Sequence, residues 1–157
     1  MLKYLLCLLF CFGLSGTAFC QGTRTGIPPF KIRLVDGTGF TYQQIEKNRP
    51  LLLIYFSPTC DHCKEFVAAL LQNRNRWKDK QVVLISYEHI REVKAFADSY
   101  HLSAYPNIKI GSEGYTFVVQ QYYQIQRFPF VALFSRQGKL IKIISDKLAP
   151  EAMVHQI

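Results

Sequence analysis

Cys60 and Cys63, two cysteines separated by two residues, have the type and spacing in this chain best suited to chemistry. They follow an apolar run and open a segment whose apolar residues recur at helical spacing. On the first turn of a helix, their Cα atoms lie within disulfide reach. The helix N-terminus favours a thiolate at Cys60, whereas Cys63 lies one turn further in and is shielded. The pattern predicts thiol–disulfide exchange in which Cys60 attacks and Cys63 resolves the mixed disulfide.

Two other uses of such a pair must be weighed. A zinc half-site needs two further ligands of similar spacing, and the histidines outside the pair, His89, His101 and His155, are scattered. A structural disulfide across a two-residue gap constrains the unfolded chain very little. We therefore expect no metal and no cofactor, and a redox-active disulfide between Cys60 and Cys63.

Asp61 and His62 lie between the two cysteines and are candidate modulating residues. An imidazole near the Cys60 sulfur would stabilise the thiolate and raise the reduction potential, whereas Asp61 acts in the opposite direction. Simple solvent exposure of both side chains is the alternative. The sequence therefore leaves open whether the pair reduces, oxidises or isomerises disulfides.

Residues 1–20 have the layout of a secretory signal peptide. Lys3 is followed by an apolar stretch too short to span a bilayer comfortably, then by small residues. Cleavage before Gln21 would leave a polar, Gly- and Pro-containing flexible arm at 21–29. The other three cysteines belong to the leader, so the mature chain keeps only the Cys60–Cys63 pair. We expect export to a periplasmic or other extracytoplasmic, oxidising compartment; an uncleaved leader acting as a membrane anchor is the alternative.

The chain has 157 residues, 49% of them hydrophobic and 19% charged, which is typical of one globular domain and excludes a disordered chain. The formal net charge is +8, but no dense run of Lys and Arg occurs. The charge thus indicates a solvated face rather than a nucleic-acid or membrane footprint, and no nucleic-acid partner or stable membrane insertion is expected after the leader is removed.

Strand-like and helix-like segments alternate along the remaining chain, 30–157, and predict a single α/β domain. The run LLLIYF at 51–56 is typical of a central strand buried on both faces. Other strands are expected at 31–35, 82–86, 108–110, 130–134 and 140–144, and helices at 40–48, from 60 onward, at 90–100, 115–122 and 149–157. This order predicts a central mixed β-sheet with helices on both faces and a hairpin near the end.

Two segments give the chain a resemblance to the thioredoxin superfamily. Residues 56–64, FSPTCDHCK, resemble its active site, and residues 123–134, YQIQRFPFVALF, resemble the loop that carries a cis-proline before the hairpin. The extra strand and helix between these segments resemble the exported redoxin branch. The resemblance implies thiol–disulfide oxidoreductase activity on protein thiols and disulfides, with an upstream redox partner. It also implies that Pro129 lies against the disulfide and that the backbone of Phe128 pairs with the substrate.

Alternatives and departures remain. Residues 100–106 have the same outline as 123–129, so Pro106 is the other candidate for the cis-proline; only Pro129 precedes a hairpin. Thr59 stands where many family members have Trp. The preceding strand lacks the buried carboxylate that moves the second cysteine's proton in many thioredoxins, and Glu88 is a weak substitute.

A non-catalytic binding or chaperone-like domain is the alternative function; the spacing of Pro58 and Thr59 disfavours a peroxidase.

Overall fold

The structure is a computed structural model that describes residues 25–157. The expected signal peptide at 1–20 and the first four residues of the expected arm lie outside this range. Within it, the strands are β1 (Lys31–Leu34), β2 (Gly39–Thr41), β3 (Leu51–Tyr55), β4 (Gln81–Ser86), β5 (Ile108–Ser112), β6 (Phe130–Phe134) and β7 (Leu140–Ile144). The α-helices are α1 (Asp61–Gln72), α2 (Ile90–Ser99), α3 (Val118–Tyr123) and α4 (Pro150–His155).

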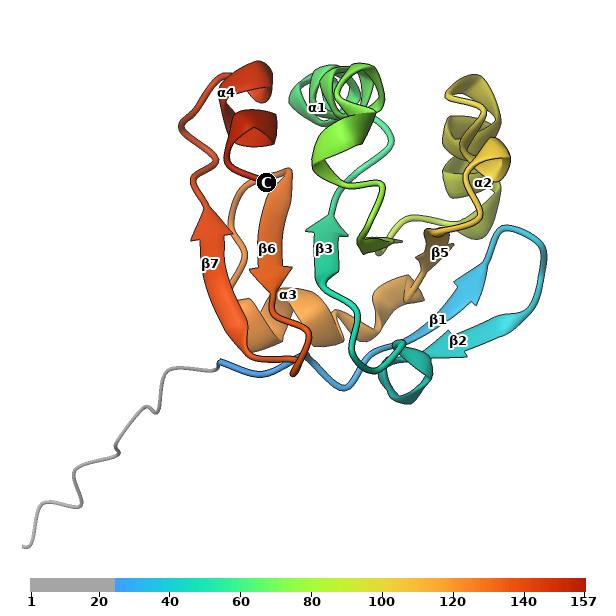
Figure 1. Cartoon of the computed structure of the whole chain (residues 1–157). Helices are drawn as coiled ribbons and strands as arrows, with labels where there is room; N and C mark the ends of the chain where they lie inside the picture. The colour runs from blue at the N-terminus through green and yellow to red at the C-terminus, as the bar shows by residue number, and fades with distance from the viewer. Residues whose placement is uncertain (1–24) are drawn as a thin grey trace, which may run out of the picture.

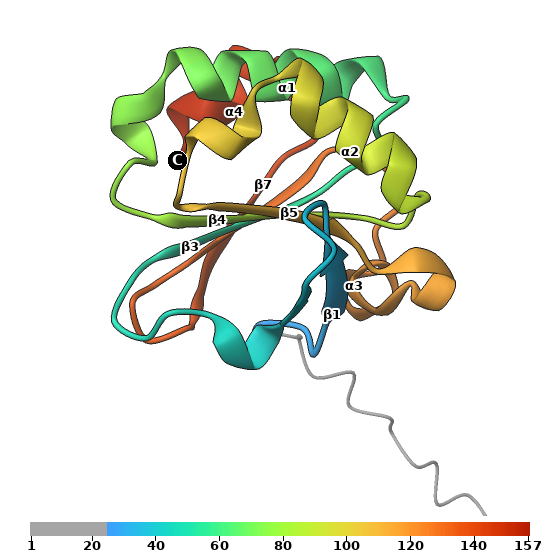
Figure 2. The ribbon, with the colours of Figure 1, turned by 90° about the vertical axis from the view of Figure 1, so that its right-hand side faces the viewer.

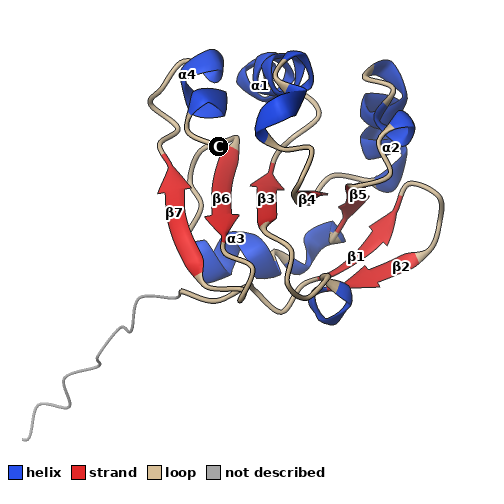
Figure 3. Cartoon of the chain, viewed as in Figure 1, coloured by secondary structure: helices blue, strands red, loops and turns tan. Residues whose placement is uncertain are grey.

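The seven strands form one mixed sheet in the order β2-β1-β5-β4-β3-β6-β7 (Figures 1 and 3). Strands β3, β4 and β5 run parallel, and the remaining pairings are antiparallel. Every residue of β3 and β4 is buried, as the continuous apolar runs predict for strands covered on both faces. The expected mixed α/β architecture is confirmed.

Helices cover both faces of this sheet (Figure 2). Helices α1, α2 and α4 lie on one side, and α3 lies on the other. Because side chains alternate along a strand, Leu52 and Ile54 of β3 pack in the cluster on the α1 side, whereas Leu53 and Tyr55 pack in the opposite cluster. Strand β3 thus packs one face against the helix that follows Cys60 and places Tyr55 on the opposite face of the sheet.

Two expected helices differ in the structure. The helix expected at 40–48 is wrong, because Phe40 pairs with Ile32 as part of β2 and only a short 3₁₀ turn, Tyr42–Gln44, follows. Pairing with β1 overrides the local helical pattern there. The helix expected at 115–122 begins only at Val118, because Phe117 has a left-handed backbone with φ of 50°.

The described part of the expected flexible arm, residues 25–29, is packed against the domain. The Thr25 carbonyl accepts a hydrogen bond from the N–H of Leu140 at 3.1 Å, and the Gly26 carbonyl accepts one from the Tyr123 hydroxyl at 2.8 Å. Pro28 is buried. These contacts correct the expectation of a free arm over this stretch, since its backbone finds partners on β7 and α3.

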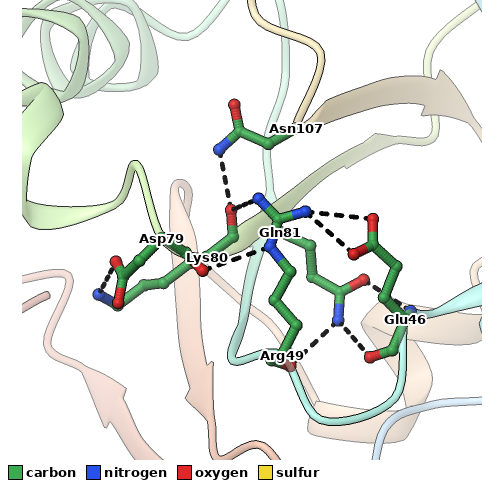
Figure 4. Close-up of polar contacts among 6 residues, drawn as sticks. All are labelled: Glu46, Arg49, Asp79, Lys80, Gln81 and Asn107. Carbon is green, nitrogen blue, oxygen red and sulfur yellow. Dashed lines mark hydrogen bonds and ion pairs between the residues drawn. The ribbon is translucent and has the colours of Figure 1, made fainter.

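A group of polar contacts holds the loop before β3 to the start of β4 (Figure 4). The buried Gln81 amide donates to the carbonyl oxygens of Glu46 and Arg49 at 2.9 and 3.2 Å, and accepts from the Glu46 N–H at 2.9 Å. Arg49 donates to the carbonyl of Lys80 at 3.2 Å and forms an ion pair with Glu46 at 3.0 Å. Because β3 runs from this loop toward the cysteines, the cluster secures the end of the sheet remote from them.

Candidate redox site

Cys60 is placed at the N-cap of α1 by the break that follows β3. Its backbone is extended, with φ of −77° and ψ of 117°, and its N–H donates to the Ser57 carbonyl at 3.2 Å. The Cys60 sulfur accepts a hydrogen bond from the N–H of Cys63 at 3.2 Å. It therefore occupies the position where unpaired helix N–H groups stabilise negative charge.

The two thiols, both free in this structure, have different surroundings. Cys63 has no exposed surface and packs in the core cluster below α1, whereas Cys60 is half-buried. Burial, and then hydrogen bonding with Cys60, hold the pKa of the Cys63 thiol far above its usual value, and the Ser57 backbone opposes this rise. The site thus combines one accessible sulfur with one protected sulfur beside it.

The backbone of Phe128 lies beside Cys60, although 68 residues separate them in the sequence. The Cys60 thiol donates to the Phe128 carbonyl at 3.8 Å, and the Phe128–Pro129 peptide bond is cis. Antiparallel pairing of β3 with β6, in which Tyr55 faces Phe130, brings the two segments together. Pro106, the other proline considered, lies exposed before β5.

Asp61 and His62 make their described contacts along the helix rather than with Cys60. Asp61 is exposed and pairs with Lys64 at 2.7 Å, and this hydrogen bond lowers the pKa of the Asp61 carboxyl. His62 Nδ1 lies 3.8 Å from a Glu65 carboxylate oxygen. Its Nε2 is buried, without a hydrogen-bond partner among the residues that the structure describes.

A polar group next to the cysteines contains Glu88. Its carboxylate accepts a hydrogen bond from the Ser57 hydroxyl at 3.3 Å, and Ser57 and Thr59 share a hydrogen bond at 2.9 Å. Glu88 thereby contacts the side chain of Ser57, whose carbonyl accepts a hydrogen bond from the N–H of Cys60. Cys63 shares its core cluster with the apolar Ile54 of β3.

One buried polar pair near the site was not predicted from the sequence. The Tyr55 hydroxyl donates to the Glu113 carboxylate at 2.7 Å, and Glu113 also accepts from the N–H of Val119 at 3.2 Å. Burial raises the pKa of the Glu113 carboxyl. The one signal in the sequence is an acidic residue in a Gly- and Ser-containing turn before an apolar segment, a pattern that fits a carboxylate near a helix N-terminus.

Residues 25–157 contain no cluster of three or more His, Cys, Asp or Glu side chains able to hold a metal ion. Over the same range, no helix is long and apolar enough to cross a membrane.

Comparison with known proteins gives a consistent picture of the fold. The family model for a thioredoxin-like domain matches residues 42–155. No curated protein sequence matches the chain significantly.

Several solved structures are similar in fold. A secreted disulfide oxidoreductase from Mycobacterium tuberculosis has a TM-score of 0.65 and 16% identity, with 82% of this chain and 96% of that chain covered. A thiol-disulfide oxidoreductase from Bacteroides fragilis has a TM-score of 0.65 and 20% identity, with 83% and 98% covered. A peroxidoxin, also from M. tuberculosis, has a TM-score of 0.69 and 14% identity, with 84% and 92% covered. At these identities the likeness concerns the fold.

Proposed function

Because this chain belongs to the thioredoxin-like domain family, we propose that it is a thiol–disulfide oxidoreductase that exchanges disulfides with protein substrates through Cys60 and Cys63. One observation carries the proposal. A half-buried sulfur lies at a helix N-terminus, 3.2 Å from a backbone N–H, and a fully buried second thiol lies one turn away. This arrangement separates the attacking role from the resolving role.

The exchange begins from the reduced pair. Cys60 loses its proton to solvent, and its thiolate attacks one sulfur of a substrate disulfide, forming a mixed disulfide and releasing one substrate thiolate. That thiolate takes up the proton that Cys63 loses. The Cys63 sulfur then attacks Cys60, closes the Cys60–Cys63 disulfide and releases the second substrate thiolate, which is protonated by solvent. Two electrons and two protons pass from the protein to the substrate.

The protein groups around the pair have defined roles in this scheme. The N–H of Cys63 stabilises the negative charge on Cys60 when it is the attacking thiolate. The elevated pKa of the Cys63 thiol keeps it protonated until the mixed disulfide has formed and Cys63 attacks it. The backbone of Phe128, next to the Cys60 sulfur, is the edge along which an extended substrate segment pairs.

The net direction of exchange depends on the redox partner that regenerates the pair. A thiol donor makes the protein a reductase, and an acceptor of electrons makes it an oxidase. We further propose export, supported by the signal-like sequence at 1–20. The test is the N-terminus of the mature protein: Gln21 supports cleavage, and Met1 supports an uncleaved leader.

Reduction of insulin by dithiothreitol tests the proposed activity. Wild-type protein should accelerate precipitation of the insulin B chain, and Cys60→Ala should remove the acceleration while the circular dichroism spectrum stays native. A wild-type rate equal to that of dithiothreitol alone would favour the non-catalytic binding domain. Full activity in Cys60→Ala would show that another group carries the reaction.

A further inference from the structure

Four aromatic side chains form a connected surface, here called the aromatic patch, next to Cys60. It consists of Phe128, Tyr87, Phe117 and Tyr115, whose successive ring centroids are 5.9, 5.6 and 6.1 Å apart. The first three rings are half-buried, and Tyr115 is 79% exposed. The patch therefore leads from the residue whose carbonyl contacts the Cys60 sulfur out to solvent.

The buried Tyr55 supports the aromatic patch from inside the domain. Tyr55, fully buried, lies 5.8 Å from Phe128 and 6.4 Å from Tyr87 between ring centroids. Its hydroxyl donates a hydrogen bond to the Glu113 carboxylate, which also accepts a hydrogen bond from the N–H of Val119 at the start of α3. The segment that carries Tyr115 and Phe117 is thus tied at both of its ends.

The backbone of this segment is also unusual. Phe117 has a φ of 50°, a left-handed conformation that a bulky residue rarely adopts. Such a conformation persists only where the surroundings impose it, and here its ring packs between Tyr87 and Tyr115. An exposed aromatic residue supported in this way is typical of a preformed contact surface.

Resting on the proposed disulfide exchange, we propose that the aromatic patch docks apolar side chains of an extended substrate segment that flank its reacting cysteine. A substrate joined to Cys60 must lie against Phe128, so the patch continues the surface that the reaction itself covers. Side chains on one face of an extended chain recur about every 6.6 Å. The spacing of 5.6 to 6.1 Å between neighbouring rings is close to this repeat, so alternate substrate residues meet successive rings.

This geometry selects one class of substrate. It favours an unfolded or locally extended protein segment with an aromatic or aliphatic residue two positions from the cysteine. Such a residue loses exposed apolar area against the rings, which speeds capture of that segment relative to a polar one.

Two matched peptides test the proposal. Each has one cysteine joined by a disulfide to glutathione; one carries tyrosine two residues before and after the cysteine, and the other carries serine. The second-order rate constant for reduction of each by pre-reduced protein is measured by chromatography of acid-quenched samples. The wild type should reduce the tyrosine peptide about five- to tenfold faster, as expected for burial of one or two aromatic contacts.

Three variants locate the preference. Tyr115→Ser and Phe117→Asn should each bring the ratio of the two rates close to one; asparagine tolerates the left-handed backbone. Tyr42→Ser, which removes a partly exposed tyrosine outside the patch, should keep the wild-type ratio. A wild type without preference, or a preference that survives both patch variants, overturns the inference and leaves disulfide exchange standing. A wild type that reduces neither peptide nor glutathione disulfide overturns the proposed function and this inference together.

Discussion

Replacing Tyr55 with phenylalanine should cost more stability at pH 8 than at pH 4, because the hydroxyl that is lost serves a buried carboxylate. The Tyr55 hydroxyl donates to Glu113 at 2.7 Å, and Glu113 is only 6% exposed. A hydrogen bond to a charged group contributes about 1.5–3 kcal/mol, against about 0.5–1.5 kcal/mol for a neutral pair. We therefore expect a loss of about 2–3 kcal/mol at pH 8 and about 1 kcal/mol at pH 4.

The direction of this pH dependence follows from the pKa of Glu113. Burial raises that pKa above its ordinary value of 4.5, and the bond from Tyr55 opposes the rise. Without the hydroxyl, the folded-state pKa rises further while the unfolded value stays the same. A raised folded-state pKa contributes stability that is full below the unfolded pKa and is lost as pH rises through the folded pKa. The carboxylate-specific cost is consequently smaller at pH 4 than at pH 8.

Urea unfolding at the two pH values measures the effect, and Tyr123→Phe is the matched control. The Tyr123 hydroxyl donates to the carbonyl of Gly26 at 2.8 Å, a neutral acceptor, so its loss should cost about 0.5–1.5 kcal/mol at either pH. If Tyr55→Phe costs the same at pH 4 and pH 8, or no more than Tyr123→Phe, Glu113 does not act as a buried carboxylate.

The cysteine pair and one glycine give three further predictions. Iodoacetamide at pH 7 should label Cys60 at least about tenfold faster than Cys63, because the Cys63 thiol is buried and its pKa is raised; equal rates would contradict the assigned roles. His62→Ala should shift the reduction potential of the pair by less than about 10 mV in glutathione equilibration, because the described contact of His62 is with Glu65 along the helix and not with the Cys60 sulfur; a shift of about 20–30 mV toward a more reducing pair, which loss of one hydrogen-bond donor at the thiolate would cause, would contradict this geometry. Gly111→Ala should lower the free energy of unfolding by about 1–3 kcal/mol, since a Cβ there meets the β1 backbone, whereas Gly39→Ala, with open space around it, should change it by less than about 0.5 kcal/mol; similar losses would contradict the close approach at Gly111.

The sequence was most informative where burial and local pattern agree. The run at 51–56 predicts a strand covered on both faces, and β3 is fully buried between two clusters. The cysteine spacing likewise predicts a helix that begins beside Cys60, as α1 does. Both features depend on a few neighbouring residues and on the hydrophobic effect, so no distant partner needs to be known.

Features that depend on distant pairing could not be predicted in the same way. Tyr55 and Glu113 are 58 residues apart, and the sequence around either residue does not indicate that the other is its partner. The patch joins Tyr87, which follows β4, to Phe117, which follows β5, because β4 and β5 run parallel and end at the same edge of the sheet. The short strand at Phe40 likewise needs β1 as its partner.

Capture of a mixed disulfide tests the central claim most directly. Cys63→Ser protein, mixed with an oxidised protein substrate such as insulin, should form a covalent adduct that dithiothreitol releases. The adduct should accumulate because the resolving thiol is absent. Peptide mapping by mass spectrometry should place its disulfide bond at Cys60, the attacking cysteine. No adduct with Cys63→Ser, or an equal yield of adduct through Cys63 in Cys60→Ser, would contradict the account.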